Sequence, residues 1–84
     1  MEYLYISRQG DKEAFRKLKN DLNEISDSEL IERYNKQVDI GIVGVHQQAL
    51  LIIAIHFSMI DRFGFSPVEI VDGVLIRLGD KIAV

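Results

Sequence analysis

The two histidines are the side chains best suited to acid–base or metal chemistry. His46 and His56 stand ten residues apart, which is about 15 Å along a helix and off-register for one shared ion. They therefore cannot chelate a metal as an i,i+4 pair does. The spacing instead indicates two partly buried imidazoles with hydrogen-bond partners, and we predict no metal and no cofactor.

The start of the helix that carries His46 is the best candidate for a ligand site. Free N–H groups and the partial positive charge of a helix N-terminus favour anions. We therefore consider an oligomeric protein that binds or sequesters a nucleotide or other anion. Its site would be built across subunits from Gly44, His46 and Gln47, together with Arg33 or Arg8.

Two features bear on nucleic-acid binding. The GxxG at 41–44 resembles the loop of KH-type RNA-binding modules, but it holds Ile and Val where a basic residue is usual. Four basic residues at helical spacing would form a stripe, diluted by nearby acids: Arg8, Lys12, Arg16 and Lys19. A nucleic-acid-binding module is therefore an alternative, against which the net charge of −3 argues.

Catalytic patterns are absent from the sequence. It contains no nucleophile elbow, Walker loop or zinc-ligand spacing. Ser58 follows His56 by two residues, so on a helix their side chains diverge by about 160°. We predict that the chain is not an enzyme.

The element that organises the chain is a charge-free stretch at 40–60, from which we predict a helix over about 44–63. A helical wheel leaves one narrow polar stripe and an apolar arc of about 200°; the stripe consists of Gln47, Ala54, Ser58 and Asp61. So small a chain should not cover that arc, so we predict self-association. The expected interface residues are Leu50, Ile53, Phe57 and Ile60.

A membrane span is the competing interpretation of this stretch, because 21 uncharged residues can cross a bilayer. The polar residues His46, Gln47, Gln48 and His56 argue against it, as does the lack of flanking Lys/Arg asymmetry. We therefore expect no membrane association.

Two shorter helices should precede the central one. Apolar residues at spacings of three and four predict a helix over about 11–24, with Asp11 as its N-cap. The second helix, about 27–38, begins with a capping box of Ser26 and Glu29.

The residues after the central helix predict strands. Gly64 suits a left-handed helix end, with Phe65 packed back on Ile60 as in a Schellman motif. Asp72-Gly73 between two apolar runs then predicts a hairpin of strands 68–71 and 74–78, with a short last strand at 81–84. A short strand at 2–7 is weakly indicated. The fold class is α+β in a single domain, 1–84.

Composition narrows the class of protein. The 84 residues are 48% apolar, with one Pro and no Cys. This indicates a globular domain without disulfides, and a chain so short gains stability from oligomerisation. No signal peptide is recognised at the start, so the expected compartment is the cytoplasm.

The run at 27–38 is similar to a segment of short uncharacterised accessory proteins of Bacteroidetes genomes and mobile elements. Gly79-Asp80-Lys81-Ile82 also resembles the end of their β-rich tails, whereas Gly44-Val45-His46 departs from them. The resemblance implies a small bacterial or phage accessory protein. Our first functional hypothesis is therefore a non-catalytic accessory protein that self-associates through its central helix and binds a partner protein.

Overall fold

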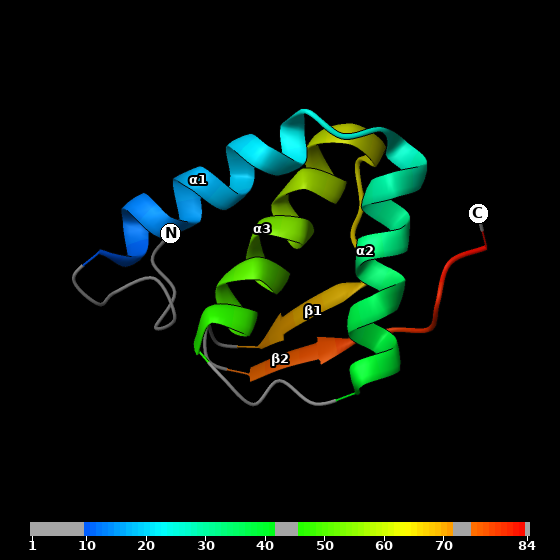
Figure 1. The fold of residues 1–84 in the computed structure, drawn as a ribbon. Helices are drawn as coiled ribbons and strands as arrows, with labels where there is room; N and C mark the ends of the chain where they lie inside the picture. The colour runs from blue at the N-terminus through cyan, green and yellow to red at the C-terminus, as the bar shows by residue number, and fades with distance from the viewer. Residues whose placement is uncertain (1–9, 42–45, 72–74, 84) are drawn as a thin grey trace.

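The computed structural model describes residues 10–41, 46–71 and 75–83. They form three helices, α1 (Asp11–Asn23), α2 (Asp27–Ile40) and α3 (His46–Phe63), followed by the strands β1 (Val68–Val71) and β2 (Leu75–Leu78). Figure 1 shows α3 between α1 and α2, with the hairpin level with the lower parts of α3 and α2 and passing behind α2. The predicted α+β fold is confirmed; the weakly indicated strand at 2–7 lies outside the described residues.

The N-cap of the first helix lies one residue earlier than expected. Its N-cap is Gly10, with a left-handed φ of 87°, and the first helical bond runs from Ala14 N to Gly10 O at 3.0 Å. The prediction of Asp11 as N-cap is wrong: Asp11 is the first residue of the helix, and its carboxylate contacts His46.

The second helix begins as predicted at its N-cap. The Ser26 hydroxyl accepts a hydrogen bond from the Glu29 backbone N–H at 3.2 Å. The Glu29 carboxylate lies 3.7 Å from the Arg33 guanidinium, one turn along the helix. The helix continues two residues past the predicted end, to Ile40, and stops at Gly41, whose φ is 77°.

The central helix supplies most of the core. Eight of its residues are buried, namely Ala49, Leu50, Ile52, Ile53, Ala54, Ile55, Ser58 and Met59. All of them except Leu50 and Ser58 belong to one core cluster with Leu22 of α1, Leu30 and Tyr34 of α2, and Val68 and Ile76 of the hairpin. Within the described ranges, no helix is long and apolar enough to cross a membrane.

The hairpin pairs Val68 with Leu78, Glu69 with Arg77, and Ile70 with Ile76. This register places the apolar pairs toward the core and leaves Glu69 and Arg77 exposed. The predicted last strand at 81–84 is wrong for its described part, because residues 81–83 form no strand. Their segment is instead bonded to a side chain of α2. Residues 72–74, with the predicted turn, lie outside the described part.

Candidate interaction site

The start of α3 is a polar junction of the three helices. The Nε2 atom of His46 lies 2.9 Å from Oδ2 of Asp11, whose side chain is only 8% exposed. Two residues further on, Nε2 of Gln48 donates to Oε1 of Gln37 in the last turn of α2, at 3.1 Å. The chain itself therefore places a carboxylate beside His46, where we had expected an external anion.

The other residues of the expected ligand site are not gathered there. Gln47 is exposed, and Arg33 is exposed on α2, where its guanidinium faces Glu29 rather than His46. Gly44 and Arg8 lie outside the described residues. The described part thus joins His46 to a carboxylate and not to the expected arginine.

The expected basic stripe is broken at Lys19. Its ammonium lies 2.6 Å from Oδ2 of Asp61 on α3 and donates to Oδ1 of Asn23 at 3.3 Å. Lys12 and Arg16 are exposed on α1, and Arg8 is outside the described residues. Lys19 is therefore held by a carboxylate, whereas Lys12 and Arg16 remain exposed among the described residues of the stripe.

The four expected interface residues have different environments. Leu50 and Ile53 are completely buried within the chain. Phe57 is partly buried and meets the ring of Phe15 edge to face, at 6.0 Å between centroids. Only Ile60 is exposed, at 39%. The chain thus covers the middle of α3 and leaves apolar surface at the end of the helix.

Phe65, just after the end of α3, is exposed, although we predicted that it packs back on Ile60. Gly64, with φ 79°, donates its N–H to the Ile60 carbonyl at 2.9 Å, a simple left-handed ending. Phe65 contacts the Phe63 ring, at 6.4 Å between centroids, and is still 64% exposed. We call Ile60, Phe63 and Phe65 the apolar tip. Its sequence signal was the aromatic residue directly after Gly64.

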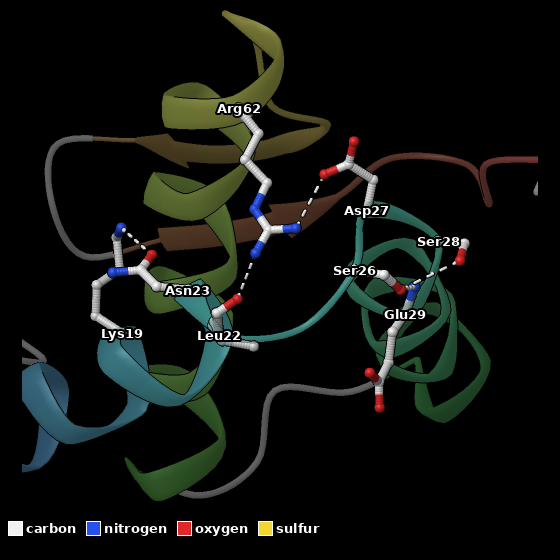
Figure 2. A network of polar contacts seen from close by, with 8 residues as sticks. All are labelled: Lys19, Leu22, Asn23, Ser26, Asp27, Ser28, Glu29 and Arg62. Carbon is white, nitrogen blue, oxygen red and sulfur yellow. Dashed lines mark hydrogen bonds and ion pairs between the residues drawn. The ribbon is translucent and has the colours of Figure 1, made fainter.

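Arg62 joins the end of α3 to the junction of α1 and α2, a role that the sequence did not suggest. Its Nη2 atom donates to the Leu22 carbonyl at 2.6 Å, and its Nη1 atom lies 3.0 Å from Oδ1 of Asp27 (Figure 2). One guanidinium thus satisfies a carbonyl at the end of α1 and pairs with the first residue of α2. This contact stabilises the backbone beside the apolar tip.

The C-terminal segment, residues 79–83, lies against α2. The carboxamide of Asn35 bonds to both backbone groups of Ile82, and the Tyr34 hydroxyl donates to the Asp80 carbonyl at 3.1 Å. Burial raises the pKa of Tyr34, and the charge of Asp80 adds to this, while the Gly79 backbone opposes it. No sequence pattern singled out Asn35, because a single amide on a polar helix face does not differ from the other polar residues around it.

The middle of α3 contains two buried polar atoms that lack hydrogen-bond partners among the described residues, His56 Nδ1 and Ser58 Oγ. Burial lowers the pKa of His56, and a backbone hydrogen bond with Val68 opposes this. The expectation of partnered imidazoles is met by His46 with Asp11 and by His56 with the Val68 backbone, although Nδ1 of His56 has no partner among the described residues. The two side chains diverge along the helix, so they form no joint site.

In the described ranges, no group of three His, Cys, Asp or Glu residues could hold a metal ion. Comparisons with family models, with curated proteins and with solved structures found no match to this chain. What the protein binds is therefore inferred from the chain's own surfaces.

Proposed function

We propose that this chain is a non-catalytic accessory protein of bacterial or phage type, acting in the cytoplasm, that self-associates and binds a partner protein. The observation that supports self-association is the apolar tip, where Phe65 is 64% and Ile60 39% exposed. Large apolar side chains exposed together on a small domain are typical of interaction surfaces.

The surroundings of the tip also suit an interface. Aromatic side chains bury much area at a low cost in conformational entropy, and they are common at interface centres. Two ion pairs flank the tip, Lys19 with Asp61 and Arg62 with Asp27. An apolar centre with a polar rim is the usual composition of an interface. In a symmetric pair, the tip of one copy would meet the same tip of the other.

The experiment measures the mass of the chain in solution by light scattering over a range of concentrations. We expect the wild type to exceed the mass of one chain and Phe65→Ser to return to it. Ile40→Ser is the matched control, because Ile40 is also an exposed apolar residue, at 51%, but lies at the end of α2. A wild type of single-chain mass at high concentration, or equal effects of the two variants, would contradict self-association through the tip.

A further inference from the structure

The C-terminal segment is held at α2 by a side-chain amide that bonds to its backbone. Asn35 Nδ2 donates to the Ile82 carbonyl at 2.7 Å, and Asn35 Oδ1 accepts from the Ile82 N–H at 2.8 Å. Both backbone groups of one residue are therefore satisfied by one side chain. Pairing of this kind recognises the peptide backbone whatever its side chain is, because a carboxamide offers both a donor and an acceptor to the two main-chain groups.

Neighbouring contacts add preferences for particular side chains. The Lys81 ammonium forms an ion pair with the Asp39 carboxylate. The Ile82 side chain is partly buried against the core, and the Tyr34 hydroxyl binds the Asp80 carbonyl. The three positions are thus recognised through a carbonyl, a positive charge and an aliphatic side chain, in that order.

The segment is attached by few contacts, and its contact with the core is made by Ile82. Asp80, Lys81 and Ala83 are exposed, and only Ile82 packs against the core. The hairpin is anchored separately, because Gly79 donates its N–H to the Pro67 carbonyl at 3.1 Å. Release of residues 80–83 would therefore leave β1, β2 and α3 in place.

We propose that Tyr34, Asn35 and Asp39 form a peptide site for an extended segment of a partner protein, in which a cationic residue is followed by an aliphatic one. The chain's own residues 80–82 occupy the site as a built-in competitor. A short tether gives its segment an effective concentration of about the millimolar range, so a free peptide of equal affinity competes poorly. This inference rests on the partner-binding part of the proposed function and not on self-association.

The test uses a fluorescent peptide with the sequence of residues 79–83 and the full chain in three forms: wild type, Ile82→Ser and Ile82→Ser/Asn35→Ala. Ile82→Ser weakens the tethered competitor and leaves the site intact. We expect it to bind the peptide at least about ten times more tightly than the wild type does. The double variant should lose this gain, because the free peptide then lacks its carboxamide partner.

Two control peptides separate specific from general binding. A peptide N-methylated at the isoleucine cannot donate to Asn35 Oδ1, and a peptide with Glu in place of lysine is repelled by Asp39. Both should bind Ile82→Ser more weakly than the original peptide. Equal binding of all three peptides, or equal affinity of Ile82→Ser and the double variant, would overturn the proposal.

A second variant covers the case in which Ile82→Ser does not fold. Lys81→Glu places a negative charge beside Asp39 and weakens the tethered segment while Ile82 is kept. It should bind the original peptide more tightly than the wild type does, and equal binding overturns the proposal. The mass of the wild type and of Phe65→Ser is measured separately. Failure of the peptide site and failure of self-association are therefore distinguishable.

Discussion

The two ends of α3 differ in how far the rest of the chain covers their side chains. At the start, His46 and Gln48 are joined to Asp11 and Gln37, so the helix end is covered by partners from the same chain. At the finish, Phe65 is exposed beside the last turn. The difference teaches that a surface becomes available for binding where the chain supplies no partner, whatever the polarity of the sequence there.

The comparison also shows that most of the interface residues predicted from the sequence are not the exposed residues of α3. The helical wheel treated the whole apolar arc of α3 as one surface, but α1, α2 and β1 cover its middle. The exposed apolar side chains of α3 and its cap are those of the last turn. Predictions about self-association should therefore be tested at Ile60 and Phe65 rather than at Leu50 and Ile53.

The largest effect should come from truncating the covered middle of the helix. Ile53 is completely buried, and Ile60 is 39% exposed. We expect Ile53→Ala to lower the free energy of unfolding by about 3 kcal/mol, because it leaves a cavity in the core. Ile60→Ala should cost less than about 1 kcal/mol, since less apolar area is lost from burial.

Urea unfolding of both variants, combined with their masses in solution, checks this prediction. The distinction between a covered middle and an exposed end of α3 would be contradicted if Ile53→Ala lowered the free energy of unfolding only slightly and reduced the mass of the oligomer. Ile53 would then belong to an interface, as we first expected from the sequence.

A smaller effect should distinguish two carboxylates at opposite ends of α3. Asp11 lies beside His46 with 8% of its side chain exposed, and Asp61 lies beside Lys19 with 63% exposed. Asp11→Ala should lower the free energy of unfolding by about 2 kcal/mol, because it leaves a partly buried imidazole without its acceptor. Asp61→Ala should cost less than about 1 kcal/mol, as exposed ion pairs do.

Chemical denaturation in low and high salt checks the second prediction. The difference between the variants should persist in high salt, which screens the exposed pair more than the buried one. Equal losses from both variants would show that the start of α3 is not the more enclosed end.

The smallest effect concerns pH and the middle of the helix. Burial lowers the pKa of His56 below its usual 6.5, so the unfolded chain takes up this proton at a higher pH than the folded chain. The free energy of unfolding is therefore at its full value above about 6.5 and falls as the pH drops below it. His56→Gln should reduce this pH dependence.

Urea titrations on either side of pH 6.5 check the third prediction. His46→Gln is the matched control, because it removes the other histidine, at the start of α3. A dependence that survived His56→Gln and vanished in His46→Gln would place the sensitive group at the polar junction instead.

The elements could be predicted because their signals are local. The spacing of Phe15, Leu18 and Leu22 indicated α1, and Ser26 marked the start of α2. Gly64 and Pro67 ended α3, and alternation indicated the two strands. In each case neighbouring residues determine backbone conformation through sterics, capping and side-chain direction.

The candidate sites were less predictable because each depends on which distant residue arrives as a neighbour. Ser58 belongs to the polar stripe of the wheel and is nevertheless completely buried. Asn35 had no pattern at all, yet it binds a residue 47 positions away. Periodicity tells which side of a helix a residue faces but not what covers that side.

The sequence by itself determined where the helices and strands of this protein lie and that α3 is its central element, because hydrophobic period and capping act over a few residues. Only the tertiary structure decided that Asp11 lies beside His46, that the end of the chain lies along α2, and that Phe65 remains exposed. These outcomes depend on contacts between segments far apart in the chain, whose geometry is set by the packing of the whole core.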